Sequence, residues 1–228
     1  MIVVAGFVMR VITRFFTRVR IEGELGSIPA TGAVLIAANH ASNADPVLIG
    51  GFLNPRLGRP VNWLGKREVF DWPFLSWLAR QGGVHPVDRG AADVEAFKTA
   101  MRILEAGHIL AVFPEGTRSP DGGLQAPKDG VAVLALRSGA LVVPIGIEDA
   151  DRLWPRGRRF PTFTPSVTVT IGRPFRLEEA LAEEAARSPS AAPLDRRRTK
   201  EAGTILIMRR IAALLPERQR GVFRGPPI

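Results

Sequence analysis

A histidine and an aspartate five residues apart, His40 and Asp45, could form the base of an acid–base site. Histidine is the side chain whose ordinary pKa best suits base catalysis near neutral pH. A nearby carboxylate would fix the imidazole tautomer and stabilise the imidazolium that forms during reaction. Because residues i and i+5 point about 140° apart on a continuous helix, the two side chains meet only if the chain turns between them. Ser42, Asn43 and Pro46 favour such a turn.

The same residues also permit a purely structural interpretation. Aspartate is a good N-cap and proline suits the first position of a helix. A helix could therefore begin at Asp45-Pro46 and leave His40 as an ordinary loop residue. The spacing alone is a weak motif, so this segment leaves both interpretations open.

A second run, residues 113–119 (FPEGTRS), could bind an anion. It follows the apolar residues 109–113, which are typical of a short buried strand. Gly116 would let the backbone approach a ligand closely, and Arg118 could hold a phosphate through two parallel hydrogen bonds. A base beside an anion site, each at the end of a strand, suggests transfer of a group onto a phosphorylated alcohol.

The other polar residues of this run are less specific. Thr117 and Ser119 add hydrogen-bond donors. Glu115 could accept hydrogen bonds from a polyol hydroxyl, or it could pair with an arginine. The alternative for the whole run is a solvated turn, because residues 119–123 are rich in turn formers.

Two further segments complete a set of four. Lys66 and Arg89 are candidate additional cations, although surface charge is the usual role of such residues. Residues 141–145 are typical of a buried strand, and Pro144 within it indicates a strand edge or end that a ligand could approach.

These four segments, in this order, resemble the PlsC-like glycerolipid acyltransferases, especially the 1-acylglycerol-3-phosphate acyltransferases. The residues that carry the resemblance are Asn39-His40 to Asp45; Lys66, Glu68, Pro73 and Arg89; Phe113 to Ser119; and Val143-Pro144-Ile145. It extends from about Arg20 to Gly221. A proline precedes Lys128 where the family usually has phenylalanine, which leaves the shape of the acyl pocket open.

The resemblance implies an acyltransferase that moves a fatty acyl group from acyl-CoA or acyl-carrier protein to the free hydroxyl of 1-acylglycerol-3-phosphate, giving phosphatidic acid. His40 would deprotonate that hydroxyl and Asp45 would orient His40. The acceptor site would comprise Lys66, Arg89, Glu115, Gly116, Thr117 and Arg118. The alternatives are another acceptor, such as glycerol-3-phosphate or an amino-acid lysolipid, and a non-catalytic basic protein that binds membranes.

Composition narrows the chemistry and the partners. The 228 residues include no cysteine and only three histidines. The lack of cysteine excludes a thiol acyl-enzyme and disulfides. We expect no metal and no cofactor beyond the acyl donor. The net charge of +9 suits anionic membranes, nucleic acids or acidic carrier proteins. Because no nucleic-acid motif accompanies the arginine runs, we expect no nucleic-acid partner.

Residues 1–19 form a distinct segment. Residues 2–9 are apolar, but Arg10 ends this run well short of the ~20 residues that a spanning helix needs. On a helical wheel Arg10, Arg14 and Arg18 share one stripe and apolar residues occupy the other side. This pattern predicts a helix lying in a membrane interface, with peripheral or monotopic attachment to the cytoplasmic face of the cell membrane. The alternatives are a helix packed on the domain and a dimer contact.

Strand-like and helix-like segments alternate through residues 20–228, which predicts one α/β domain with a mixed central sheet flanked by helices. Expected strands cover residues 19–22, 33–38, 61–65, 84–87, 109–113, 141–147 and 166–171. Expected helices cover residues 46–53, 72–81, 91–106, 130–138, 176–186 and 195–215. Residues 150–165, rich in arginine and proline, predict a long loop near the site.

Overall fold

The computed structural model describes residues 2–71, 73–87, 92–128, 130–187 and 195–224. Its strands are β1 (Thr17–Gly23), β2 (Val34–Ala38), β3 (Val61–Lys66), β4 (Val84–Val87), β5 (Ile109–Val112), β6 (Leu141–Glu148), β7 (Thr164–Ile171) and β8 (Phe175–Arg176). Its α-helices are α1 (Ile2–Phe16), α2 (Asp45–Leu57), α3 (Pro73–Gln81), α4 (Ala92–Glu105), α5 (Gly130–Ser138), α6 (Ala150–Leu153), α7 (Leu177–Arg187) and α8 (Arg196–Ala213).

One mixed sheet runs through the middle of the molecule in the order β1-β7-β6-β2-β5-β3-β4, with β8 beside β6. Neighbouring strands from β6 to β4 are parallel, whereas β7 is antiparallel to β6 and parallel to β1. The central strand β2 (VLIAA) is buried along its whole length, as expected for a parallel strand covered on both faces. The predicted α/β domain with a mixed sheet is confirmed.

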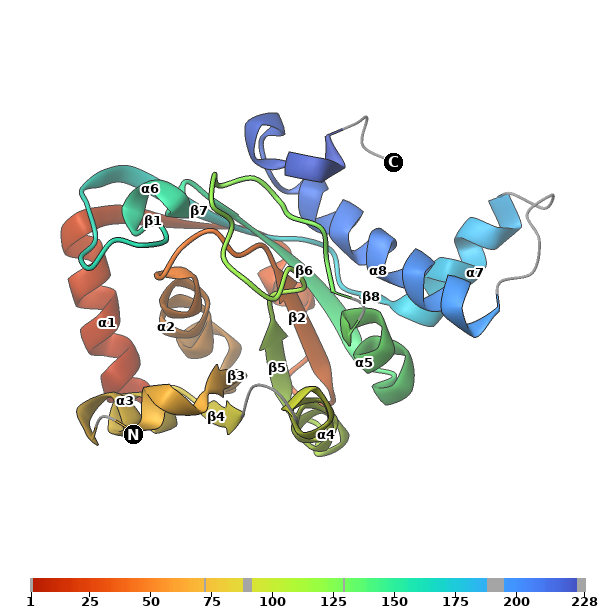
Figure 1. Cartoon of the computed structure of the whole chain (residues 1–228), viewed down its shortest axis with the longest axis horizontal. Helices are drawn as coiled ribbons and strands as arrows, with labels where there is room; N and C mark the ends of the chain where they lie inside the picture. The colour runs from red at the N-terminus through yellow and green to blue at the C-terminus, as the bar shows by residue number, and fades with distance from the viewer. Residues whose placement is uncertain (1, 72, 88–91, 129, 188–194, 225–228) are drawn as a thin grey trace.

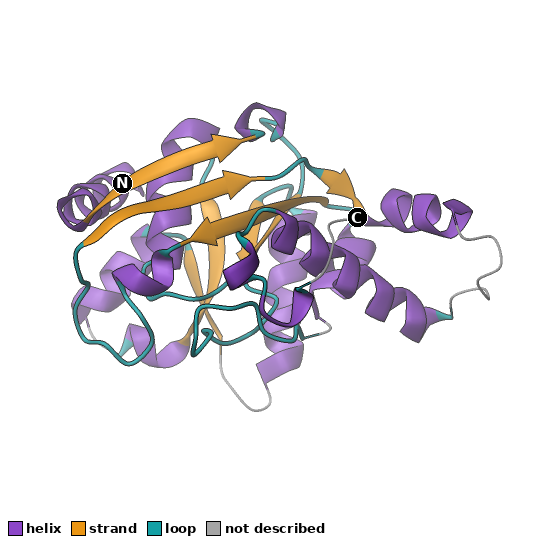
Figure 2. Ribbon diagram, turned by 90° about the horizontal axis from the view of Figure 1, so that it is seen from above, coloured by secondary structure: helices purple, strands orange, loops and turns teal. Residues whose placement is uncertain are grey.

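Two helical layers cover the sheet (Figure 1). Leu35 and Ala37 of β2 point into a core completed by α4, α5, α7 and α8. Val34 and Ile36 alternate to the opposite face and pack against α2. Helix α1 lies outside α2, where Gly6 and Gly51 let the two helices approach closely. Figure 2 shows the long strands side by side with helices on either side.

The topology brings three loops together. Strands β2, β5 and β6 are parallel neighbours, so their carboxyl ends lie at one edge of the sheet. This edge is where open α/β sheets bind their ligands. The segments that leave it are residues 39–44 after β2, 113–128 after β5 and 149–163 after β6. The first of these segments contains His40, and the second contains Arg118.

The structure corrects several expected boundaries. Helix α1 ends at Phe16 rather than at residue 19, because Thr17–Gly23 pairs with β7 as the edge strand β1. The expected loop 150–165 begins instead with the short helix α6, and residues 154–163 form the loop proper. Arg89, the expected start of a helix at Ala91 and the expected loop at 188–193 lie outside the described residues.

Candidate active site

His40 and Asp45 are in direct contact. The Nδ1 atom of His40 lies 2.8 Å from Oδ2 of Asp45, because the chain turns at Asn43 and Ala44 between them. An ionised carboxylate only accepts hydrogen bonds, so Nδ1 carries the proton and donates it. The other ring nitrogen, Nε2, is then free to accept a proton. The predicted contact across a turn is confirmed.

Asp45 acts on the loop rather than on the helix that it begins. It is 0% exposed, and its Oδ2 also accepts hydrogen bonds from the backbone N–H groups of Ala41 and Ser42, at 2.9 and 2.8 Å. The residue at the N-cap position is Ala44, so the N-cap interpretation of Asp45 is wrong. Burial raises the pKa of Asp45, and the hydrogen bond from His40 opposes that rise. Its Oδ1 atom is buried without a partner among the described residues.

The backbone of His40 is held by the second run. Its N–H donates to Oε1 of Glu115 at 2.6 Å, and its carbonyl oxygen accepts from the N–H of Ser119 at 2.7 Å. Both main-chain hydrogen-bonding groups of the histidine are thus fixed by the loop that follows β5. The imidazole can turn only about its own side-chain bonds.

Glu115 is a structural link between loops. It is 3% exposed, and its Oε2 accepts from the N–H of Gln125 at 2.8 Å while Oε1 holds His40. Neither expected partner, an arginine or a substrate hydroxyl, accounts for this geometry. Burial raises the pKa of Glu115 to about 7, and the two backbone N–H donors oppose that rise.

The imidazole also has an aromatic neighbour. Its ring stacks on Phe113, with centroids 3.9 Å apart and 10° between the planes. The ring of Trp63 also stacks on Phe113, with centroids 5.6 Å apart. This stack restricts the orientation of the imidazole.

Arg118 lies against residues 39–44, here called the catalytic loop because they include the proposed base His40. Its Nη1 donates a hydrogen bond to Oδ1 of Asn43, two residues before Asp45. A guanidinium carries five donors, so this contact leaves others for an anion. The predicted arginine and the predicted base are therefore connected through one side chain.

The turn that carries Arg118 is open to solvent. Gly116 has a φ of 67°, in the left-handed region that favours glycine, and both Gly116 and Thr117 are exposed. A Cβ atom at Gly116 would lie 2.8 Å from two side-chain carbons of Lys128. Gly116 thus makes room for a lysine beside the loop, which adds a cation to the expected acceptor site.

The two other predicted cations are less well placed by the structure. Lys66 is the last residue of β3, so its backbone lies at the same sheet edge. Arg89 lies outside the described residues. Sequence reasoning did not assign roles to Asn43, Phe113, Gln125 or Lys128. Only Lys128 carried a local signal, as the lysine after Pro127.

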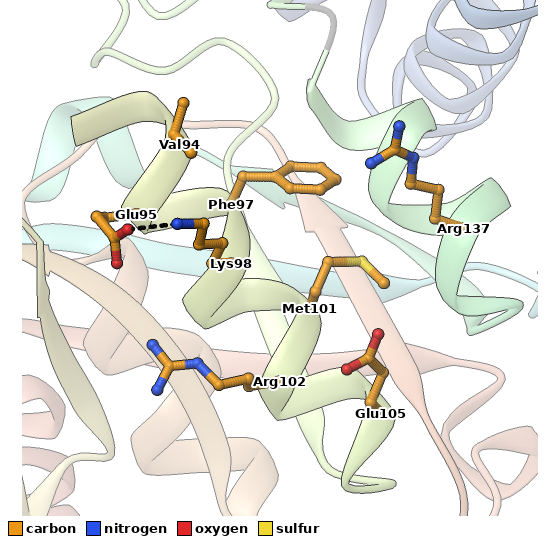
Figure 3. A pocket seen from close by; sticks show the side chains of 8 residues that line it. All are labelled: Val94, Glu95, Phe97, Lys98, Met101, Arg102, Glu105 and Arg137. Carbon is orange, nitrogen blue, oxygen red and sulfur yellow. Dashed lines mark hydrogen bonds and ion pairs between the residues drawn. The ribbon is translucent and has the colours of Figure 1, made fainter. Parts of the chain in front are cut away.

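A separate groove of about 710 Å³ lies on α4 and α5 (Figure 3). Its lining combines apolar side chains such as Phe97 and Met101 with charged ones such as Lys98 and Glu105. It contains no residue from the loops that carry His40 or Arg118. We therefore place the candidate active site at the sheet edge. No group of three or more metal-ligating acidic, histidine or cysteine side chains occurs in the described part of the chain.

Comparison with known proteins identifies the family. A family model described as Acyltransferase matches residues 18–148, which include both loops of the site. A chloroplastic 1-acyl-sn-glycerol-3-phosphate acyltransferase of Arabidopsis thaliana is 33% identical over 186 residues, covering 79% of this chain and 50% of that protein. A lyso-ornithine lipid O-acyltransferase of Pseudomonas aeruginosa is 32% identical over 130 residues, covering 57% of this chain and 46% of that protein.

A solved structure agrees with these sequence relatives. The crystal structure of the 1-acyl-sn-glycerophosphate acyltransferase PlsC from Thermotoga maritima has a TM-score of 0.68 and 28% identity, covering 92% of this chain and 77% of that one. The chain spans about half the length of the curated relatives above. The matched region and the fold together show that the chain belongs to the PlsC-like acyltransferase family.

Proposed function

We propose that this protein transfers a fatty acyl group from a thioester donor, acyl-CoA or acyl-carrier protein, to the free hydroxyl of 1-acylglycerol-3-phosphate. The product would be phosphatidic acid. The observation that carries the proposal is the 2.8 Å contact between His40 and Asp45, in a loop that also bonds Arg118 through Asn43. Relatives named as 1-acyl-sn-glycerol-3-phosphate acyltransferases support the substrate.

The reaction follows from the free ring nitrogen of His40. Nε2 accepts the proton of the acceptor hydroxyl while that oxygen attacks the thioester carbonyl carbon. The buried Asp45 carboxylate stabilises the imidazolium that forms. The carbon–sulfur bond then breaks and the departing sulfur takes the proton back from His40. The products are an ester and a free thiol, with the base regenerated.

The acceptor phosphate would bind at the turn of residues 116–118, where Arg118 and Lys128 supply positive charge. Lys66, at the end of β3, and Arg89 remain proposed contributors. Glu115 has a supporting role in this proposal, since its two carboxylate oxygens hold the backbone of His40 and Gln125.

We also propose that α1 attaches the enzyme to the membrane surface and that residues 20–228 form the acyltransferase domain. The apolar side of α1 faces solvent: Phe7 is 58% exposed and Phe15 is 72% exposed. A helix that served only to pack on the domain would bury that side. Within the described residues, no helix has both the length and the apolar character needed to cross a bilayer. The position that we propose for this helix is peripheral or monotopic, on the cytoplasmic face of the membrane.

Thiol release tests the proposed chemistry directly. Purified protein is mixed with acyl-CoA, and free thiol is measured with and without 1-acylglycerol-3-phosphate in mixed vesicles. We expect release that depends on the acceptor and equals the phosphatidic acid formed. Release that is independent of every lysolipid would contradict the transferase assignment.

A second acceptor deserves the same assay because one relative is named a lyso-ornithine lipid O-acyltransferase. A lyso-ornithine lipid has no phosphate monoester, so it would offer Arg118 no phosphate to bind. The ratio of kcat/KM for the two acceptors decides between them. We expect the phosphate acceptor to be preferred, and a preference for the ornithine lipid would reassign the substrate without changing the acyl-transfer chemistry.

A further inference from the structure

The exposed apolar surface of α1 continues onto a second segment. Residues 154–163, here the arginine–phenylalanine loop, connect α6 to β7 and end beside the carboxyl-terminal end of α1 (Figure 1). Phe163 of this loop contacts the rings of Phe15 and Phe16, with centroids 5.8 and 5.2 Å apart. The two segments thus share one aromatic cluster.

Most of the exposed large hydrophobic side chains in the described residues lie on these two segments. Eleven large hydrophobic residues are exposed among those whose side chains the structure describes, and seven of them lie on α1 or on this loop: Phe7, Val8, Val11, Ile12, Phe15, Phe160 and Phe163. Phe160 and Phe163 are 70% and 72% exposed. Contiguous exposed apolar surface of this kind marks a contact with a membrane or a partner.

The charged residues around this apolar surface indicate which partner it contacts. The loop contains Arg156, Arg158 and Arg159, all exposed, and no acidic residue. Arg14 and Arg18 line a hollow of about 610 Å³ next to the same aromatic cluster. Aromatic rings bordered by arginines match the apolar interior and the anionic headgroups of a bilayer. A protein partner would need acidic residues around an apolar centre, whereas an anionic bilayer offers negative charge and an apolar interior over any area.

The loop has a defined shape that presents these side chains outward. Thr162, near the end of the loop, is bonded to the residues just before its start. Its N–H donates to the carbonyl oxygen of Leu153 at 2.7 Å, and its hydroxyl donates to the carbonyl oxygen of Arg152 at 2.6 Å. The indole N–H of Trp154 donates to the carbonyl oxygen of Arg158 at 2.9 Å. Because these bonds order the loop before binding, little entropy is lost when it meets a surface.

The same loop is bonded to the catalytic loop. The carbonyl oxygen of Trp154 accepts from the N–H of Asn43 at 2.9 Å and from the hydroxyl of Ser42 at 3.0 Å. The side-chain amide of Asn43 also donates to the carbonyl oxygen of Pro155 at 3.3 Å. Ser42 and Asn43 lie between His40 and Asp45, so the position of this loop and the position of the base are mechanically linked.

We propose that the arginine–phenylalanine loop is a second membrane-contact element, which rests with α1 on an anionic bilayer and holds the catalytic loop at the lipid surface. This inference rests on the proposed membrane position of α1 and adds a site that the helix alone does not supply. It explains why aromatic tips lie on a loop that has no catalytic side chain of its own.

Single-cysteine labelling tests the contact on the full chain, because the natural sequence contains no cysteine. Phe160→Cys carries an environment-sensitive fluorophore and is mixed with vesicles of equal parts phosphatidylcholine and phosphatidylglycerol. Phe7→Cys reports on α1, and Val222→Cys, at a position 66% exposed, is the matched control. We expect a blue shift and quenching by nitroxide lipids at positions 7 and 160, and neither at position 222.

The outcomes separate the two proposals. Labels that enter lipid at position 7 while position 160 stays in water would overturn this inference and leave the membrane role of α1 intact. If both stay in water, both membrane proposals fail, whereas acceptor-dependent thiol release still decides the enzymatic one. A label at position 222 that responds equally would show non-specific adsorption and would also overturn the inference.

Partitioning gives a second, quantitative test. Phe160→Ser should weaken vesicle binding about tenfold through lost apolar burial. Arg158→Gln with Arg159→Gln should weaken it about fivefold per arginine, and only at low salt. The charge-matched control replaces Arg196 and Arg198, which are exposed on α8, by glutamine. Equal weakening by the control pair would reduce the effect to net charge and contradict a specific surface.

Discussion

The catalytic loop and helix α1 differ in how far the rest of the domain supplies their contacts. In the loop, both backbone groups of His40 are bonded to the run after β5, and its imidazole contacts Asp45 and Phe113. In α1, the apolar side is left to solvent. The domain thus supplies the geometry of the chemistry by itself, whereas α1 leaves a surface that only an external apolar phase can cover.

This contrast suggests a division of labour. Preorganised groups lower a reaction barrier because they need no rearrangement in the transition state. A lysolipid acceptor, in contrast, resides in a membrane, and delivery depends on how the protein meets it. Changes in the catalytic loop should therefore affect turnover on every acceptor, and changes on the surface of α1 should affect only acceptors presented in vesicles.

The largest effect should come from the base. His40→Ala should lower kcat by about 10²–10⁴-fold, the usual contribution of a general base, on both vesicle-bound and water-soluble short-chain acceptors. His108→Ala, at an exposed histidine, is the control and should behave as the wild type. A folded His40→Ala protein that retains most of its activity would rule out the mechanism.

Glu115, which holds the backbone of His40, should make the free energy of unfolding depend on pH. Burial raises the pKa of Glu115 from 4.5 to about 7, so the favourable contribution of this group is present below pH 4.5 and lost as pH rises through 7. At 1.36 kcal/mol per pKa unit, the wild type should lose about 3 kcal/mol relative to Glu115→Gln over that range. Denaturation of both proteins from pH 4 to 8 measures the difference.

The control for this experiment is Glu217→Gln, at an exposed glutamate. Its stability relative to the wild type should not change across the same range. A constant difference between wild type and Glu115→Gln would show that Glu115 is not held in the buried environment that the structure gives it.

A smaller effect is expected where the protein meets the acceptor headgroup. Arg118→Lys removes planar two-bond recognition of a phosphate while keeping the charge. We expect kcat/KM for 1-acylglycerol-3-phosphate to fall about tenfold, mainly through KM, with acceptors lacking the phosphate little affected. Equal losses on both acceptors would mean that the contact with Asn43 is the whole role of Arg118.

The smallest effect on folding should come from α1. Phe7→Ser with Val11→Ser changes side chains that are 58% and 52% exposed, so the free energy of unfolding should change by less than about 0.5 kcal/mol. Turnover of vesicle-bound acceptor should fall several-fold while turnover of a soluble short-chain acceptor is unchanged. A large loss of stability would show that these side chains are packed in solution.

The parts of the site that could be predicted from the sequence are those with a local signal. His40 and Asp45 stand five residues apart among turn formers, and the FPEGTRS run follows an apolar strand. The alternation of apolar segments and helix patterns likewise predicted the α/β fold. In each case residues close in the chain carry both the structural and the chemical information.

The remaining contacts join residues that are far apart in the chain. Nothing near Glu115 indicates that its carboxylate holds the backbone of His40, 75 positions away. The bonds from Asn43 to Trp154 and Pro155 depend on the crossover that places β6 beside β2. Helix α1 ends at Phe16 because the residues that follow it pair with β7 as strand β1. A helical wheel carries no information about such strand pairing.

The central claim is that His40 and Asp45 act as one unit, and a double-mutant cycle tests it most directly. The kcat of acyl transfer to 1-acylglycerol-3-phosphate is measured for the wild type, His40→Ala, Asp45→Asn and the double variant. Asp45 serves the reaction only through His40, so the double variant should be no slower than His40→Ala alone. Losses that multiply in the double variant would show that Asp45 contributes independently of His40 and would contradict the account.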